Sequence, residues 1–250
     1  MQDRSTVDNN TEDHYMATAP KGLKRNKQKP EPYSYDIRGN LEVTAIYETI
    51  QGEGPFAGRP AVFVRLSGCN LQCPHCDTDY TSIRTKLSPA VIAEKIKLCM
   101  PIKPQLVVLS GGEPFRQNIT LLTKLLINSG ITVQIETNGT IFLNDFPFDK
   151  TCIIVSPKTA EVHPHFRTNA NGYKYILDAD HVDEDGLPTS SLGMKQRPAR
   201  PVSKSIPIWV QPMDSGNEKK TTENLEVAVR SCMTFGYRLS LQIHKIIGLP

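Results

Sequence analysis

Long apolar runs, a strong net charge and an apolar leader are all missing from this chain of 250 residues. Even its best apolar runs, such as 106–109 and 152–155, are short, whereas a transmembrane helix needs about 20 apolar residues. We therefore expect no contact with a membrane. The formal net charge is only +3, which argues against nucleic-acid binding, because nucleic-acid-binding chains are usually strongly basic. The first 25 residues are polar and lack a signal-peptide segment, so we expect a cytoplasmic protein.

Hydrophobic residues are also scarce, at 38%, while prolines number 19, so part of the chain should lie outside a core. Residues 1–40 hold few large apolar side chains and show no helical or strand period, and we expect them to form a disordered extension. The basic cluster from Lys21 to Lys29 could meet an anionic partner, although a solvated tail is the simpler interpretation. Residues 41–250 should form one folded domain, in which 159–207 is a long crossover insertion.

Short β-prone runs alternate with helical patterns from Leu41 onward. This alternation predicts right-handed βαβ units and a mostly parallel sheet. A chain of about 210 residues is short for a complete (β/α)8 barrel, so we expect a partial TIM barrel of about six mostly parallel strands with a reduced set of helices. The expected strands are 43–47, 61–66, 105–109, 132–136, 152–155, 173–177, 208–211 and 239–244.

Three segments have helical patterns. Ser88 and Pro89 open the first as N-cap and first-turn proline, and the second spans 119–127. The third spans 222–235 and stops at Gly236. From the spacing we expect buried faces that contain, in the first helix, Val91, Ile92, Ile96 and Leu98, and in the third, Leu225, Val229, Cys232 and Met233.

Polar residues gather directly after four of the expected strands, in the segments 110–113, 136–139, 156–158 and 211–214. In barrels of this kind the carboxyl ends of the strands form the active-site face. The repetition at successive strands predicts an enzyme site there.

The cysteines show the sharpest pattern in the sequence. Cys69, Cys73 and Cys76 form a C-x3-C-x2-C run after an expected strand, and three such thiolates can ligate three irons of a [4Fe–4S] cluster. No fourth cysteine is near in sequence, which leaves one iron open to S-adenosylmethionine. Zinc is the alternative, but His75 adjoins Cys76, so a zinc site needs a distant fourth ligand. The remaining cysteines, Cys99, Cys152 and Cys232, are expected to be small buried hydrophobes.

The cysteine run, followed by Gly111-Gly112-Glu113-Pro114 after the next strand, resembles the radical S-adenosylmethionine (SAM) superfamily. In that superfamily the residue before the third cysteine is usually aromatic and lies beside the adenine, whereas this chain has His75. Glycines at a strand end let the backbone approach a ligand closely. The resemblance implies a radical SAM catalytic domain over 41–250.

Five ordered blocks narrow the resemblance to the 7-carboxy-7-deazaguanine synthase family. They are 50–54, 63–69, 76–78, 211–214 and 242–245. The resemblance implies a carbon–nitrogen lyase that converts 6-carboxy-5,6,7,8-tetrahydropterin to 7-carboxy-7-deazaguanine, with ring contraction and loss of ammonia, in queuosine biosynthesis. It also implies a [4Fe–4S] cluster, SAM, Mg²⁺, a reductant such as flavodoxin or ferredoxin, and a homodimer.

The resemblance also implies roles for individual residues. Thr78 would bind Mg²⁺ through its hydroxyl, and Arg65 would pair with the substrate carboxylate; Glu53 would contact the substrate or orient Arg65. His244 would be a hydrogen-bond donor near the site or a core histidine. The other expected substrate contacts are Ile50, Gln51, Gly52, Ser110 and the terminal Pro250, and the expected cofactor contacts are His75, Cys76, Asp77, Gly112, Ser156, Pro157, Lys158, Gln211, Pro212, Met213 and Asp214. Lys158 and Asp214 have a simpler interpretation as an ion pair.

Two other functions remain open at this point. A glycyl-radical activase of the same superfamily would need a groove for docking its partner protein and often has further ferredoxin-type cysteines. This sequence contains no second cluster of cysteines. A zinc- or cluster-binding module without catalytic activity would use the basic arm from Lys21 to Lys29 to meet RNA.

Overall fold

The computed structural model describes residues 25–100 and 105–250. One curved sheet of nine strands runs through them in the order β3-β1-β2-β4-β5-β6-β7-β8-β9. The strands are β1 (Leu41–Ile50), β2 (Pro60–Leu66), β3 (Thr85–Leu87), β4 (Leu106–Gly111), β5 (Thr132–Thr137), β6 (Cys152–Val155), β7 (Gly172–Leu177), β8 (Ile208–Pro212) and β9 (Arg238–Leu239). Strands β2 and β4 to β8 pair in parallel, while β1 is antiparallel to both β2 and β3.

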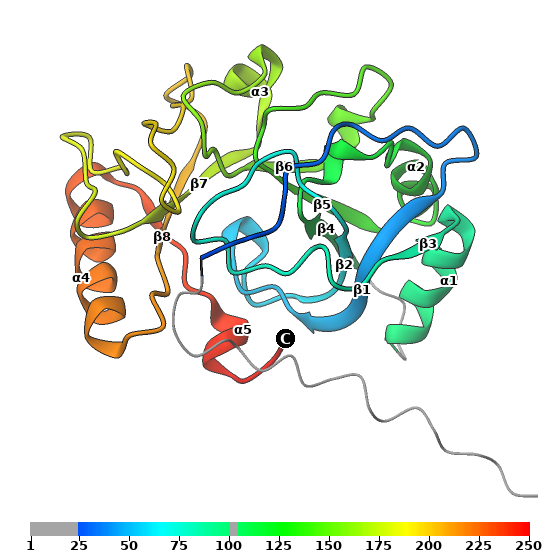
Figure 1. The fold of residues 1–250 in the computed structure, drawn as a ribbon, viewed down its shortest axis with the longest axis horizontal. Coiled ribbons are helices and arrows are strands. Elements are labelled where there is room, and N and C mark those ends of the chain that lie inside the picture. Colours follow the sequence, from blue (N-terminus) through cyan, green and yellow to red (C-terminus); the bar gives the residue numbers. More distant parts are fainter. Residues whose placement is uncertain (1–24, 101–104) are drawn as a thin grey trace, which may run out of the picture.

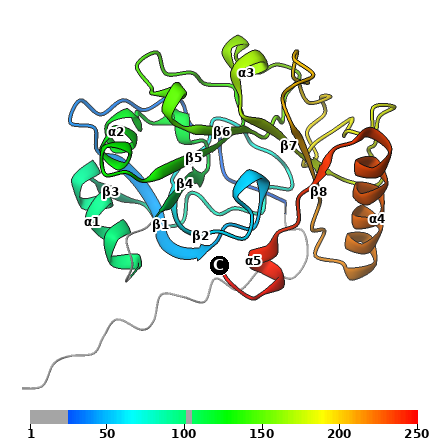
Figure 2. The same cartoon turned by 180° about the vertical axis from the view of Figure 1, so that it is seen from behind.

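The parallel strands are apolar along most of their length because both of their faces are covered. In β4, residues 106–109 are fully buried. Figures 1 and 2 show the sheet curving around a central space, with α1 and α2 outside one end of it and α4 outside the other. The six long parallel strands confirm the predicted partial barrel.

The set of helices in the described ranges is reduced, as the chain length predicted. They are α1 (Pro89–Cys99), α2 (Thr120–Asn128), α3 (Pro164–Asn169), α4 (Glu218–Phe235) and α5 (Ile243–Ile246), with 3-10 turns at Gly54–Phe56, Pro114–Arg116 and Phe148–Lys150. The predicted caps are present: the Val91 backbone N–H donates to Ser88 Oγ at 3.3 Å, and Gly236 ends α4 with φ of 73°. No helix in the described ranges is long and apolar enough to cross a membrane.

Two of the predicted helix faces were wrong in part. Leu98 in α1 and Met233 in α4 are 85% and 83% exposed, and Val91, Leu225 and Val229 are exposed as well. Of the predicted face of α4 only Cys232 is buried, and the other buried residues of this helix are Asn224, Ala228 and Ser231. Small and polar side chains face the sheet here because loops from the barrel edge pack closely against this helix.

The last predicted strand, 239–244, was wrong except at Leu239. Only Arg238–Leu239 pairs with β8, and the segment that follows turns into the short helix α5. His244 therefore lies on a helix and not after a strand.

The expected disorder of residues 1–40 does not extend to the described part of that segment. Backbone hydrogen bonds join Asn26 to Pro74, Glu31 to Cys69 and Ser34 to Arg116. Polar groups of the extended chain thus replace the missing apolar core contacts. Residues 1–24 lie outside the described ranges.

Candidate active site

The carboxyl ends of the parallel strands meet on one face of the barrel and bring the predicted residues together. The cysteine loop 67–80 follows β2, and Gly112 follows β4, whereas residues 51–53 follow β1, whose antiparallel pairing places Ile50 opposite Pro60 at the start of β2. Ser156 to Lys158 follow β6, and residues 211–214 span the end of β8. Arg65 and Ser110 are direct partners in the register of β2 and β4.

The glycine pair after β4 is required first by the protein's own backbone. A Cβ on Gly111, whose φ is 116°, would collide with the Leu66 backbone, and a Cβ on Gly112 would collide with the Gly68 carbonyl. Gly112 and Glu113 also donate backbone hydrogen bonds to the Leu66 and Gly68 carbonyls. The glycines therefore seat the end of β4 against the start of the cysteine loop.

The cysteine loop holds its thiols in a largely buried position. Burial raises the pKa of Cys69 to about 12 and that of Cys76 to about 11, and it also raises the pKa of Cys73. All three cysteines interact electrostatically with buried Lys158. A buried thiolate needs a cation beside it, and iron ions would supply that charge.

The donor set fits a cluster better than a single ion. Within the described part of the chain, no group of three or more His, Cys, Asp and Glu side chains could hold one metal ion. A [4Fe–4S] cluster needs no such convergence, because each thiolate binds its own iron. The three cysteines on one loop therefore fit the iron–sulfur interpretation.

Lys158 lies at the end of β6 beside the other residues expected to bind the cofactor. Its ammonium donates to the Ser156 carbonyl and hydroxyl oxygens, both at 2.6 Å, and burial lowers its pKa. The ion pair of Lys158 with Asp214 that we considered is not among the ion pairs of the described residues. Asp214 is paired instead with Lys245 at 3.3 Å, and Lys245 also reaches Asp77 at 3.5 Å.

A buried polar network lies where the substrate residues were expected. Lys174, on β7, pairs with Glu53 and with Glu136, the latter at 3.1 Å. The Gln51 amide donates to Glu136 Oε1 at 3.1 Å. Burial opposes the charge of Lys174, but the carboxylates of Glu136 and Glu53 outweigh it and raise its pKa. The network is therefore a desolvated cation between two carboxylates.

Glu53 bonds to Lys174 and Gln242 in this network and does not bond to Arg65. Its second oxygen accepts a hydrogen bond from the Gln242 amide at 2.9 Å, and Lys174 and Gln242 outweigh burial and lower its pKa. Arg65 instead donates to the Tyr47 hydroxyl at 2.9 Å and forms no ion pair within the described ranges. Its guanidinium is thus not paired with a carboxylate among residues 25–100 and 105–250.

Lys174 and Tyr47 belong to none of the motifs in the sequence, and Gln242 was visible only as part of the block 242–245. Lys174 is an interior position of one predicted strand and Tyr47 is the last residue of another, and alternation alone does not separate a buried polar side chain from a solvated one there. Glu136 was visible as one of the polar residues after a strand.

The end of the described chain returns to the first strand. The Ile243 backbone donates to the Gly52 carbonyl at 3.3 Å, and a Cβ on Gly52 would collide with the His244 ring. The Thr49 hydroxyl donates to the Pro250 carbonyl at 2.8 Å. His244 and Pro250 are therefore close to the predicted substrate residues, and burial lowers the pKa of His244.

Glu113 ties the ends of β4 and β5 together. Its fully buried carboxylate accepts hydrogen bonds from the Thr137 hydroxyl and the Asn138 backbone, both at 2.7 Å. Burial raises the pKa of Glu113 to about 7.

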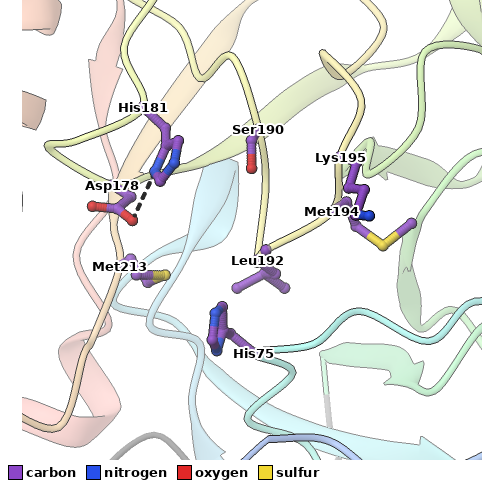
Figure 3. Close-up of a pocket in the computed structure, with 9 residues that line it drawn as sticks. His75, Asp178, His181, Ser190, Leu192, Met194, Lys195 and Met213 are labelled. Atoms are coloured by element: carbon purple, nitrogen blue, oxygen red, sulfur yellow. Dashed lines mark hydrogen bonds and ion pairs between the residues drawn. The ribbon is translucent and has the colours of Figure 1, made fainter.

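A cavity of about 410 Å³ adjoins the cysteine loop (Figure 3). His75 and Met213, two of the expected cofactor contacts, lie on its wall, and Asp178 and His181 are joined across 3.1 Å at its edge. The crossover 159–207 supplies the rest of the lining, which is Ser190, Leu192, Gly193, Met194 and Lys195.

Thr78, the expected Mg²⁺ ligand, lies two residues after Cys76 and is half-buried. Its hydroxyl donates to the Asp77 carboxylate at 3.3 Å. Hydroxyl and carboxylate oxygens such as these are of the type that Mg²⁺ prefers.

Comparisons with known proteins agree with this site. The Radical SAM superfamily matches residues 63–147, which include all three clustered cysteines. A 7-carboxy-7-deazaguanine synthase of Rhodospirillum rubrum is 40% identical over 220 residues, covering 84% of this chain and 93% of that protein. The enzyme of that name from Rickettsia prowazekii is 35% identical, with 84% and 88% covered. The crystal structure of QueE from Escherichia coli matches with a TM-score of 0.59 and 25% identity, over 81% of this chain and 94% of that chain.

Proposed function

Because this chain belongs to the 7-carboxy-7-deazaguanine synthase family of the radical SAM superfamily, we propose how its residues carry out the reaction of that family. The enzyme is a radical SAM lyase that converts 6-carboxy-5,6,7,8-tetrahydropterin to 7-carboxy-7-deazaguanine, with ring contraction and loss of ammonia. The observation that carries this function is that one curved sheet holds both the buried cysteine loop and the buried Lys174 network, and that Lys158 interacts electrostatically with both.

The cysteines Cys69, Cys73 and Cys76 would hold three irons of the cluster, and the fourth iron would take SAM. When bound, the cluster and SAM supply one-electron chemistry that removes a hydrogen atom from the substrate. The residues that would line SAM are His75, Cys76, Asp77, Gly112, Ser156, Pro157, Lys158, Gln211, Pro212, Met213 and Asp214. Support for this assignment comes from the shared cavity of His75 and Met213 and from the link of Asp77 and Asp214 through Lys245.

The substrate would lie between β1, β2 and β4. Arg65 would bind its carboxylate with two parallel hydrogen bonds, leaving Tyr47 to orient the guanidinium. Gln51 and Glu53 would face the aminopyrimidine edge, and Lys174 would keep Glu53 ionised. The remaining contacts would come from Ile50, Gly52, Ser110 and Pro250.

Mg²⁺ would bind Thr78 and complete its shell with water and substrate oxygens. An ion there would fix one conformer of the substrate carboxylate, which favours a single ring-contracted product. We also propose a reductant such as flavodoxin or ferredoxin, a cytoplasmic location and a homodimer. Exposed apolar side chains on α1 and α2, among them Leu98 and Leu121, offer surface for self-association, which light scattering after gel filtration would measure.

The function is tested by anaerobic assay of the reconstituted enzyme with 6-carboxy-5,6,7,8-tetrahydropterin, with and without Mg²⁺. The wild type and the Cys99→Ser control should bind about four irons per chain and form 7-carboxy-7-deazaguanine. Cys73→Ala should lose both the iron and the activity. A Cys73→Ala enzyme that keeps its cluster and turns over would contradict the assignment.

A further inference from the structure

Residues 25–34 run in an extended conformation alongside the cysteine loop, as the dark blue segment in Figure 1. Their exposure alternates: Arg25, Lys27 and Lys29 face solvent, whereas Asn26 and Gln28 are half-buried. A period of two in an isolated extended segment indicates that one side of it lies against the protein. The cysteine loop that it faces contains no helix or strand over 67–80, so its polar backbone groups need partners elsewhere.

Asn26 supplies partners at the second cysteine. Its backbone N–H donates to the Pro74 carbonyl at 2.8 Å, and its side-chain amide donates to the Cys73 carbonyl at 3.1 Å. The same amide donates to the Tyr80 hydroxyl at 3.3 Å. Asn26 therefore joins the middle of the cysteine loop to its end.

Gln28 supplies partners after the third cysteine. Its amide nitrogen donates to the Thr78 carbonyl at 2.9 Å, and its oxygen accepts from the Tyr80 backbone N–H at 2.8 Å. The Gln28 backbone N–H donates to Asn26 Oδ1 at 2.9 Å, so the two side chains act as one unit.

The rest of the segment is anchored to the body of the barrel. The Glu31 backbone donates to the Cys69 carbonyl at 2.7 Å, and the Ser34 backbone donates to the Arg116 carbonyl at the same distance. The Glu31 carboxylate pairs with Arg84 at 2.6 Å and with Arg116 at 3.3 Å. Because Arg116 is only 3% exposed, this end of the segment is held by a buried cation.

We propose that residues 25–34 form a strap that positions the cluster-binding loop, with Asn26 and Gln28 as positioning residues. The strap contacts the carbonyl of Cys69, that of Cys73 and the Thr78 carbonyl two residues beyond Cys76, so it constrains the loop at each thiol that would bind iron. The inference rests on the proposed function only in taking this loop as the site of the cluster.

The strap is tested first without any cluster, by hydrogen exchange of the full-length apo chain. In the double variant N26A/Q28A, amides of 69–81 should exchange about fivefold faster for each hydrogen bond lost, the ratio expected from the net contribution of one bond. Amides of α4, on the far side of the sheet, should be unchanged. Lys27→Ala, between the two residues but facing solvent, is the matched control and should behave as the wild type.

The second measurement is the rate at which the reconstituted proteins release iron to a chelator. N26A/Q28A should release iron several-fold faster than the wild type and Lys27→Ala. Gln28→Glu, which keeps the acceptor for the Tyr80 N–H but loses the donor to Thr78, should be intermediate.

Unchanged exchange of 69–81 in the double variant would overturn the strap, and so would faster exchange without faster release of iron. If N26A/Q28A does not fold, Gln28→Glu takes its place. Exchange of 69–81 and release of iron no faster in Gln28→Glu than in Lys27→Ala would overturn the strap. A wild type that takes up no cluster would contradict the proposed function, while the exchange experiment on the apo chain would still report on the strap.

Discussion

Lys174 is the residue whose environment departs most from what its type prefers. A lysine is almost never fully buried unless it is paired, and here it lies between Glu53 and Glu136 with 7% of its side chain exposed. Its charge lowers the pKa of Glu53 and so holds that carboxylate in its ionised form inside the barrel. The residue thus links the stability of the chain to the shape of the substrate site.

Replacing Lys174 by methionine should lower the free energy of unfolding by about 3–5 kcal/mol, because two buried carboxylates lose their cation. Urea denaturation of the cluster-free chain would measure this. The triple variant Lys174→Met, Glu53→Gln, Glu136→Gln should recover part of the loss, since it removes the unpaired charges as well. Equal stability of the single variant and the wild type would show that the network is solvated.

Arg65→Lys should raise KM for the substrate by about tenfold or more, because an ammonium cannot form the two parallel hydrogen bonds of a guanidinium to a carboxylate. Steady-state kinetics of the reconstituted enzyme would show the effect in KM more than in kcat. The exposed Arg38→Lys is the control. An unchanged KM would place the substrate carboxylate elsewhere.

Glu113 should make stability depend on pH. Burial raises its pKa to about 7 from an ordinary value of 4.5, so between these pH values the folded chain binds more protons than the unfolded chain. Its contribution is therefore present at low pH and is lost as the pH rises through about 7.

On raising the pH from about 5 to about 8, the free energy of unfolding of the wild type should fall by on the order of 3 kcal/mol more than that of Glu113→Gln. The glutamine variant should be less stable at low pH, because its amide nitrogen cannot accept the Asn138 N–H, and this difference should narrow as the pH rises. Parallel pH curves for the two proteins would mean that Glu113 keeps its charge in the folded chain.

Motif residues were predictable one by one, while their partners were not. The cysteine run, the glycine pair and Arg65 carry recognisable local patterns. The partner of Arg65 proved to be Tyr47, and that of Asp214 proved to be Lys245. Such pairings depend on which strand ends meet in space, and the sequence contains no local signal for them.

At the scale of elements, strands were predicted better than helix faces. A parallel strand such as β4 is apolar on both sides, so its sequence is unambiguous. In α4 the apolar positions are exposed, whereas Asn224 is fully buried. Its amide donates to the Met213 carbonyl at 2.8 Å and its oxygen accepts from the Ala179 N–H at 2.9 Å. The helix is oriented by a polar contact that joins the ends of β7 and β8, and a count of apolar residues cannot detect it.

The C-cap of α4 offers a test of how firmly this helix is held. Gly236 has a left-handed backbone with φ of 73°, and a Cβ there would meet no atom within 4 Å. Gly236→Ala should therefore cost about 1 kcal/mol of unfolding free energy from backbone strain alone. Gly236→Asn, which tolerates that conformation, should cost less, and chemical denaturation would measure both. Equal losses for both variants would point to a steric clash instead.

At the scale of the whole molecule, the cavity beside the cysteine loop depends on segments far apart in sequence. The crossover 159–207 forms its outer wall. Within the crossover, Arg200 donates to the Asp185 carboxylate at 2.8 Å, and the Ser231 hydroxyl on α4 donates to the Gly186 carbonyl at 2.5 Å. The crossover also contacts the cysteine loop, where the backbone N–H of His75 donates to the Leu192 carbonyl at 3.0 Å. The long insertion is thus a wall of the expected cofactor site rather than an excursion from the barrel.

Gly193 is the point where this wall meets His75. Its φ is 76°, and a Cβ would lie 2.7 Å from His75 Cδ2, so Gly193→Ala should push the ring or the crossover away and weaken the binding of SAM by about tenfold, or about 1.4 kcal/mol. Equilibrium binding to the cluster-loaded protein would measure this. Gly58→Ala is the matched control, because Gly58 also has a positive φ, of 88°, but its Cβ would meet nothing within 4 Å. If both variants bind SAM as the wild type does, the crossover does not form a wall of the cofactor site; if both weaken it equally, backbone strain and not contact with His75 is the cause.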